Sequence, residues 1–142
     1  MTDRTANVTW SGSLMEGSGT IQSVDSGAFG PLDVSWASRT EDHEGLTSPE
    51  ELIAAAHAAC FSMALSHALA QTGTPAERLE TSATVTFVPG TGITRSALSV
   101  RGLVPGIDEG AFRDAAEGAK ENCPVSKALA AVPEITLDAA LA

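Results

Sequence analysis

The chain has 142 residues, enough for one domain with a hydrophobic core of moderate size. Apolar residues make up 43% of it and the mean hydropathy is +0.07, which excludes a disordered chain. The net charge is −10 and Lys and Arg are not clustered, so neither nucleic acid nor an anionic membrane is expected as a partner. The residues after Met1 lack the layout of a signal peptide, so we expect a cytoplasmic protein.

The first 37 residues have the alternating pattern of β-strands. Val8 and Trp10 alternate with polar residues, residues 20–24 continue the pattern, and residues 32–36 alternate again. Residues 38–47 follow as a polar connection.

A long helix is predicted to begin at Pro49. Ser48 suits the N-cap, and Glu51 completes a capping box with it. No charged residue occurs between Leu52 and Thr72, which raises the alternative of a membrane span, but two histidines and two serines argue against it. We therefore predict a helix that is buried on nearly all sides. A small domain covers such a helix poorly, so the pattern favours a dimer.

The second half of the chain predicts a hairpin, two helices and a last strand. The predicted elements are strands at 83–87 and 93–104, a helix capped by Asp108, a short helix starting at Cys123, and a strand at 135–137. Together with the first half, this order predicts a single α+β domain over residues 1–142 with a mainly antiparallel sheet.

Two cysteines, Cys60 and Cys123, are the most informative side chains. In a reducing compartment a structural disulfide is not expected, and two cysteines are catalytic, redox-sensing or simply buried. They lack the number and spacing of a thiolate zinc site, and no phosphate loop or dinucleotide fingerprint is present, so we expect no metal and no cofactor. Cysteine usage alone leaves open two unconnected core residues.

Cys60 lies about three turns into the long helix. An apolar site raises the pKa of a thiol and leaves it inert, so a nucleophilic Cys60 needs a cation nearby. Arg39 is the best candidate, and Glu50 can pair with it and aim the guanidinium at the thiolate. The residues alone leave open that Glu50 only favours the helix dipole and that Arg39 is solvated.

The sequence indicates the roles of Cys123 and His57 less clearly than that of Cys60. Cys123 stands at a helix start, where the dipole favours a thiolate, and this suits a resolving cysteine, although an incidental helix-start residue is the alternative. His57 could act as a base for Cys60, but a lone histidine on an Ala-rich face is more typical of a satisfied core residue. The acidic segment 41–44 is more typical of a charged surface loop than of a metal site.

Two motifs resemble those of the OsmC/Ohr family, and specifically of its OsmC branch. The first is residues 49–66, PEELIAAAHAACFSMALS, and the second is residues 122–129, NCPVSKAL. Residues 104–108 and 134–138 are also similar to OsmC-type sequences. The loop from Arg39 to Glu50 is one residue longer than in that branch. The similarity spans almost the whole chain.

The resemblance implies a fold and a set of site residues. The fold is a mainly antiparallel sheet wrapped around a long buried central helix, in an intertwined homodimer with each active site at the subunit interface. In the family the cysteine at the position of Cys60 is peroxidatic and the one at Cys123 is resolving. The residues that match Arg39 and Glu50 form the pair that activates the thiolate.

The resemblance also implies a reaction, the reduction of organic hydroperoxides and, to a varying degree, of hydrogen peroxide, in defence against oxidative and osmotic stress. Cys60 would become a sulfenic acid, Cys123 would form a disulfide with it, and an external dithiol, either a lipoylated protein or a small dithiol, would reduce the disulfide. An apolar lining favours organic peroxides. Two other functions stay open: a redox-sensing or ligand-binding module without efficient turnover, and a thiol hydrolase that uses Cys60 with His57.

Overall fold

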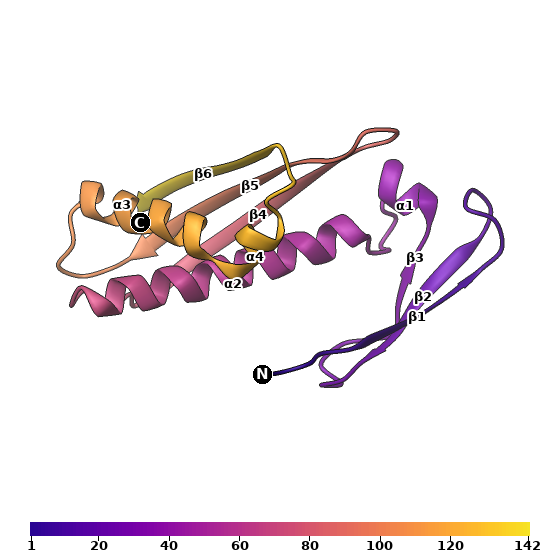
Figure 1. Cartoon of the computed structure of the whole chain (residues 1–142), viewed down its shortest axis with the longest axis horizontal. Helices are drawn as coiled ribbons and strands as arrows, with labels where there is room; N and C mark the ends of the chain where they lie inside the picture. The colour runs from indigo at the N-terminus through magenta and orange to yellow at the C-terminus, as the bar shows by residue number, and fades with distance from the viewer. The chain divides into compact units, whose positions relative to one another are not determined.

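The computed structural model describes all 142 residues, which form six strands and four helices (Figure 1). In chain order the elements are β1 (Ala6–Ser11), β2 (Ser18–Val24), β3 (Leu32–Val34), α1 (Trp36–Thr40), α2 (Pro49–Gln71), β4 (Arg78–Val88), β5 (Gly92–Leu103), α3 (Glu109–Asn122), α4 (Pro124–Ala128) and β6 (Glu134–Leu141). The chain divides into two compact units, Met1–Leu52 and Ile53–Ala142.

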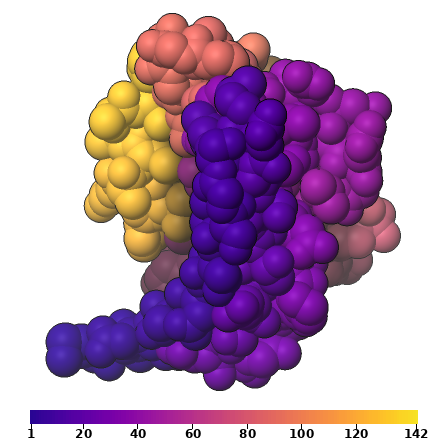
Figure 2. Space-filling model, turned by 90° about the vertical axis from the view of Figure 1, so that its right-hand side faces the viewer, coloured from indigo at the N-terminus to yellow at the C-terminus, as the bar shows by residue number.

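The first unit is a three-stranded antiparallel sheet followed by helix α1. The strand order is β1-β2-β3, and every residue of β1 is exposed, as the indigo surface in Figure 2 shows. Gly19 of β2 lies opposite Trp10 of β1, and a Cβ at that position would come within 2.6 Å of the indole ring. The close approach of the two strands therefore requires glycine. Ile21 is the one buried apolar side chain of this unit.

Helix α1 corrects the prediction of a polar connection over residues 38–47 and of a strand that continues to Trp36. The strand ends at Val34, and residues 36–40 are helical. The cause is local: the hydroxyl of Ser35 accepts a hydrogen bond from the Ser38 N–H, and the hydroxyl of Ser38 accepts one from the Ser35 N–H. This reciprocal capping box starts a helix that the alternating pattern conceals.

The second unit is a three-stranded sheet packed against helices. Strand β5 is central, antiparallel to β4 and parallel to β6. The side chains of β5 that are buried against the helices alternate with less buried ones along the strand. They form one core with residues of α2 and α3, namely Phe61, Leu65, Leu69, Leu98, Val100, Val104, Phe112, Ala116, Ala119 and Cys123. The α+β class is thus confirmed, with two small sheets in place of the single predicted one, and most strand pairs are antiparallel.

Helix caps are largely as predicted. Asp108 accepts a hydrogen bond from the Ala111 N–H at the start of α3. At the start of α2 the hydroxyl of Ser48 accepts one from the Glu51 N–H, but the Glu51 carboxylate accepts from the hydroxyl of Thr47, so the capping box is only half formed. Glu51 therefore ties the loop before α2 to its first turn.

Helix α2 is buried along one stripe only. His57, Phe61, Leu65 and Leu69 recur every four residues and are each fully buried. The opposite face is exposed, so the prediction of a helix buried on nearly all sides is wrong for the single chain. By length and composition α2 could cross a membrane, with a mean hydropathy of 1.5 over its most apolar stretch, but core helices of folded domains meet the same criterion.

Candidate active site

Arg39 and Glu50 form the ion pair that the sequence predicts, within the first unit. Arg39 lies on α1 and Glu50 in the first turn of α2. The Arg39 Nε donates to Glu50 Oε1 at 2.9 Å, and Nη2 donates to the same oxygen at 2.8 Å. Glu50 is buried, whereas the Arg39 side chain is 29% exposed. A buried carboxylate thus fixes a guanidinium that still reaches the surface.

An apolar hollow adjoins this ion pair. Its volume is about 170 Å³, and Arg39 forms part of its wall. Trp36 also lines this hollow, and the Arg39 Cζ lies 6.0 Å from the centroid of its ring. The remaining lining residues are Trp10, Leu14, Val34, Ser35 and Pro49. The hollow therefore combines one cation with aromatic and aliphatic walls.

Cys60 and Cys123 lie side by side in the second unit. Both are free thiols: Cys123 belongs to the buried core, and Cys60 packs against that core. Cys60 is half-buried in the middle of α2, and Cys123 is fully buried between the end of α3 and the start of α4. Residues 63 positions apart are joined because α2 and the α3–α4 corner pack on one core.

The environment of Cys60 disfavours its thiolate. Burial raises the pKa of the Cys60 thiol, the hydrogen bond with Cys123 raises it further, and a backbone hydrogen bond from Val125 offsets only part of this. A thiolate at this position therefore needs an additional positive group, as the sequence predicts.

The environment of Cys123 favours its thiolate, as its helix-start position predicts. Burial, the largest effect, raises the pKa of Cys123, but hydrogen bonds together outweigh it and lower that pKa. The donors are the Cys60 thiol, the backbone N–H groups of Ser126 and Val125, and the Ser126 hydroxyl. The groups that lower the pKa of Cys123 thus belong to Cys60 and to the first turn of α4.

His57 is a satisfied core residue and not a base for Cys60. Its Nδ1 lies 2.7 Å from the Ser96 hydroxyl and its Nε2 lies 2.8 Å from the Ser126 hydroxyl. Because both ring nitrogens are occupied, the hydrolase arrangement of Cys60 with His57 is absent. Sequence reasoning missed both serines. The position of Ser126, three residues after Cys123, could have marked it as part of this region. The contact of Ser96 with His57 could not be predicted, because it depends on the register of β5.

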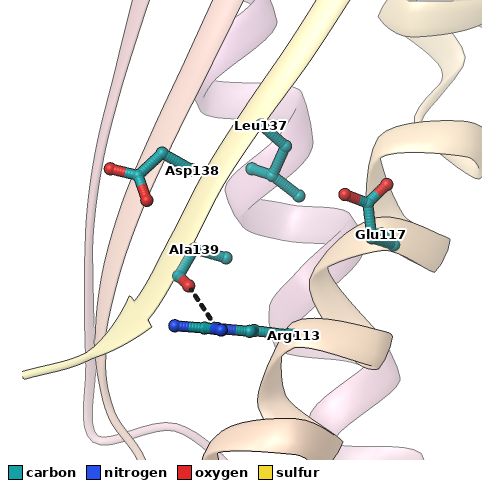
Figure 3. Close-up of a pocket in the computed structure, with 5 residues that line it drawn as sticks. All are labelled: Arg113, Glu117, Leu137, Asp138 and Ala139. Atoms are coloured by element: carbon teal, nitrogen blue, oxygen red, sulfur yellow. Dashed lines mark hydrogen bonds between the residues drawn. The ribbon is translucent and has the colours of Figure 1, made fainter.

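Two other parts of the chain, the acidic segment 41–44 and the hollow between α3 and β6, contain neither cysteine. No group of three or more His, Cys, Asp and Glu side chains could hold a metal ion, and the acidic segment 41–44 is no exception. A hollow of about 280 Å³ between α3 and β6 contains neither cysteine. There Arg113 donates from Nε to the carbonyl oxygen of Ala139 at 3.2 Å (Figure 3). Arg113 also forms an ion pair with Glu109. This arginine therefore serves to attach the edge strand to α3.

Two free thiols packed in one core define a dithiol protein of the α+β class. Residues 41–138 match the family of OsmC-like proteins. Over 132 residues the chain is 44% identical to the peroxiredoxin OsmC of Escherichia coli K12. The aligned residues make up 91% of this chain and 90% of that protein. The peroxiredoxin OsmC of Shigella flexneri matches equally well. The chain belongs to the OsmC family.

Solved structures share the fold at lower identity. An organic hydroperoxide resistance protein from Elizabethkingia anophelis aligns with a TM-score of 0.72 and 22% identity, over 97% of this chain and 96% of that one. The organic hydroperoxide resistance protein OsmC from Legionella pneumophila aligns with a TM-score of 0.70 and 23% identity, over 96% of each chain. The α+β architecture with two small sheets and a central helix is thus that of the family.

Proposed function

We propose that this chain is a thiol-dependent peroxidase that reduces organic hydroperoxides. The observation that carries the proposal is the pair of free thiols, because Cys60 and Cys123 pack in one core and each affects the pKa of the other without being joined. Two adjacent sulfurs pass between dithiol and disulfide with a short movement. The names of the Escherichia coli and Shigella relatives support the same reaction.

The proposed cycle has three steps. The Cys60 thiolate attacks one oxygen of the hydroperoxide, the O–O bond breaks, and the alcohol leaves after taking up a proton, which leaves Cys60 as a sulfenic acid. Cys123 then attacks the Cys60 sulfur, the S–O bond breaks, and the sulfenic hydroxyl leaves with the Cys123 proton as water. An external dithiol, a lipoylated protein or a small dithiol, returns two electrons and two protons.

In this proposal Arg39 stabilises the Cys60 thiolate and the charge that develops on the leaving oxygen. Glu50 orients the guanidinium through its two short hydrogen bonds. The raised pKa of Cys60 is the reason that the reaction needs such a cation.

The hollow beside Arg39 supports a preference for organic hydroperoxides over hydrogen peroxide. Its walls of Trp10, Leu14 and Trp36 offer apolar surface to an alkyl group while the guanidinium faces the peroxide oxygens. Hydrogen peroxide has no apolar part to bind there. Faster turnover of hydrogen peroxide than of cumene hydroperoxide would contradict this preference.

We also propose that the protein is a cytoplasmic homodimer in which residues 1–142 form one OsmC-like domain, with a role in stress defence. The support is an uncharged, exposed face of α2 and an unprotected strand β1. The exposed face of α2 is formed by Ala55, Ala56, Ala59, Met63, Ser66, His67 and Ala70. Small residues let a second copy approach closely, and Met63, which is 72% exposed, supplies apolar area to bury.

The test of the reaction compares the wild type with Cys60→Ser and Cys123→Ser. We expect Cys60→Ser to lose all peroxide consumption, and Cys123→Ser to oxidise once at Cys60 without forming the intramolecular disulfide. Steady-state consumption of cumene hydroperoxide with dihydrolipoamide, and then with thioredoxin, measures both the activity and the choice of reductant. Peroxidase activity that persists in Cys60→Ser would overturn the proposal.

One observation favours a second candidate, a redox-sensing or ligand-binding module that oxidises without efficient turnover. The raised pKa of Cys60 lowers the thiolate fraction and hence the rate of attack. This alternative predicts a Cys60–Cys123 disulfide but slow peroxide consumption even with excess dithiol, so the same assay separates the two.

A further inference from the structure

The hydroxyl of Ser38, in helix α1 of the first unit, is buried and connects two segments of the chain. Ser38 is 7% exposed. Its hydroxyl oxygen accepts a hydrogen bond from the Ser35 N–H at 3.0 Å, and the hydroxyl donates toward the carbonyl oxygens of Ser35 at 2.9 Å and of Thr47 at 3.1 Å. Thr47 precedes α2, which begins at Pro49. The hydroxyl therefore ties α1 to the segment that leads into α2.

Thr47 is itself anchored to the first sheet. Its N–H donates to the carbonyl oxygen of Asp33 at 3.2 Å, and it forms an isolated parallel bridge with Val34 at the end of β3. We call the contact between the Ser38 hydroxyl and the Thr47 carbonyl the clasp. The clasp closes the base of the loop formed by residues 41–46 and holds α1 to a segment that is fixed on β3.

The loop above the clasp does not fix α1 against the start of α2. Residues 41–45 are exposed, and the hydrogen bonds of residues 42–46 join these residues to one another. The first unit has one buried apolar side chain, Ile21, so packing contributes little there. The ion pair of Arg39 with Glu50 is partly exposed, and such pairs contribute little to stability by themselves.

The clasp and the ion pair join the same two segments. Ser38 directly precedes Arg39 on α1, and Thr47 lies three residues before the carboxylate partner of that arginine. Nε and Nη2 of Arg39 converge on Glu50 Oε1 at 2.9 Å and 2.8 Å. A displacement of α1 by about 1 Å would lengthen both contacts beyond hydrogen-bond distance. The geometry of the ion pair therefore depends on what holds α1 in place.

The capping box of α1 does not account for the clasp. In a capping box the Ser38 oxygen acts as an acceptor for the Ser35 N–H, whereas the contact with Thr47 uses the hydroxyl as a donor to a different segment. Alanine at position 38 would keep the backbone N–H that donates to the Ser35 hydroxyl. The start of α1 thus survives Ser38→Ala, and the clasp does not.

We propose that Ser38 is a positioning residue for Arg39: its hydroxyl holds α1 to the Thr47 carbonyl, so that the guanidinium meets Glu50 in one fixed geometry. The inference rests on the proposed peroxidase function for its effect on turnover, but not for the geometry of the ion pair. It assigns Ser38 an effect on the attack of Cys60 on peroxide and none on the formation of the disulfide.

The first experiment follows the Arg39 Nε–H of the full chain by proton–nitrogen NMR, with its signal identified as the one lost in Arg39→Lys. Because this N–H donates to both oxygens of Glu50, we expect slow exchange with water in the wild type. Ser38→Ala should speed the exchange about fivefold, the size expected for one lost hydrogen bond. Ser38→Thr keeps the hydroxyl and should exchange as the wild type does. Unchanged exchange in Ser38→Ala overturns the proposal.

Thr40→Val is the matched control on the same helix. The Thr40 hydroxyl also donates to a carbonyl oxygen, that of Trp36 at 2.9 Å, but this contact stays within α1 and reaches no second segment. We expect Thr40→Val to leave the exchange of the Arg39 Nε–H unchanged. Equal effects of Thr40→Val and Ser38→Ala would assign them to the stability of α1 and contradict the positioning. Should Ser38→Ala not fold, Ser38→Val compared with Ser38→Thr removes the same hydroxyl at equal volume.

The second experiment measures the second-order rate of Cys60 oxidation by cumene hydroperoxide. Ser38→Ala should lower this rate about fivefold, and Ser38→Thr should restore it. In the Arg39→Ala background Ser38→Ala should have no further effect, because the residue that it positions is gone. A merely structural role would lower the free energy of unfolding and leave the rate of the folded protein unchanged.

The two experiments separate failure of the positioning from failure of the proposed function. If the wild type does not react with peroxide, the proposed function fails while the exchange of the Arg39 Nε–H still tests the clasp. If the wild type reacts and Ser38→Ala reacts equally fast, the positioning fails alone. An additive loss in the double variant with Arg39→Ala would also overturn it, since Ser38 would then act by another route.

Discussion

The two units of the chain differ in what stabilises them and in the chemistry that they carry. The second unit, Ile53–Ala142, contains the whole buried apolar core and both thiols. The first unit, Met1–Leu52, has one buried apolar side chain, Ile21, and carries the Arg39–Glu50 pair. The Cys123 thiol thus lies where water is excluded, the Cys60 thiol lies half-buried beside it, and the guanidinium lies where water remains.

This difference follows from the cost of burying each group. A neutral thiol enters an apolar core at little cost, whereas a buried guanidinium must be matched by a carboxylate and by hydrogen bonds. The first unit meets that requirement with Glu50 but has little apolar area of its own to stabilise it. The guanidinium of the first unit is therefore held by polar contacts, and the thiols of the second unit are held by packing.

The largest expected effect contrasts the stability of the two units. Phe61→Ala in the core of the second unit should lower the free energy of unfolding by about 4 kcal/mol, because it removes a fully buried ring and leaves a cavity. Val8→Ala on exposed β1 should change it by less than about 0.5 kcal/mol. Urea unfolding of both variants measures this. A large and concentration-dependent loss for Val8→Ala would show instead that β1 is covered in an oligomer.

The next effect concerns the cation. Arg39→Ala should lower the second-order rate of Cys60 oxidation by cumene hydroperoxide about 100-fold, because a preorganised charge that stabilises the transition state is lost. Arg39→Lys should recover only part of this, since a single ammonium nitrogen cannot replace the Nε and Nη2 donors that converge on Glu50 Oε1. Arg95→Ala is the control, because Arg95 is exposed and only loosely paired with Glu134. Equal losses for Arg39→Ala and Arg95→Ala would assign the effect to net charge.

Much of the fold was accessible from sequence because caps and alternation are local signals. Ser48, Asp108 and the alternating residues of β4 identify their elements directly. The order of strands into two sheets, the parallel pairing of β5 with β6, and the exposed face of α2 are set by contacts between distant segments. Helix α1 was missed because Leu32, Val34 and Trp36 continue one alternating pattern across its start.

The candidate site likewise has one part that the sequence predicts and one part that depends on tertiary structure. The pairing of Arg39 with Glu50 could be predicted, since an arginine near a helix start needs a carboxylate and Glu51 has a capping role. That Cys123 has the lower pKa of the two thiols depends on groups of Cys60 and of the first turn of α4, and this arrangement is tertiary. The catalytic roles of Cys60, Cys123, Arg39 and Glu50 stay predictions until the variants are measured.

A smaller effect separates two neighbouring carboxylates in the first turn of α2. Glu50→Gln should lower the rate of Cys60 oxidation about tenfold, because a neutral amide orients the Arg39 guanidinium less firmly than a carboxylate does. Glu51→Gln should leave the rate unchanged, since Glu51 contacts Thr47 and not Arg39. Stopped-flow oxidation of the two variants under identical conditions measures the difference. Equal effects would mean that the charge at the helix start matters, and not the ion pair.

The smallest expected effect is the contribution of His57, in the second unit, to the pH dependence of the free energy of unfolding. Because the pKa of His57 is lowered by burial, the unfolded chain takes up a proton below pH 6.5 that the folded chain does not bind. Wild-type stability should therefore be retained above pH 6.5 and fall as the pH drops toward the folded pKa, by at most about 1.4 kcal/mol per pH unit from this group. Urea unfolding of wild type and His57→Asn across this range isolates the contribution, since the carboxylates titrate in both proteins. A His57→Asn curve parallel to the wild type would show that the buried ring is protonated in the folded protein.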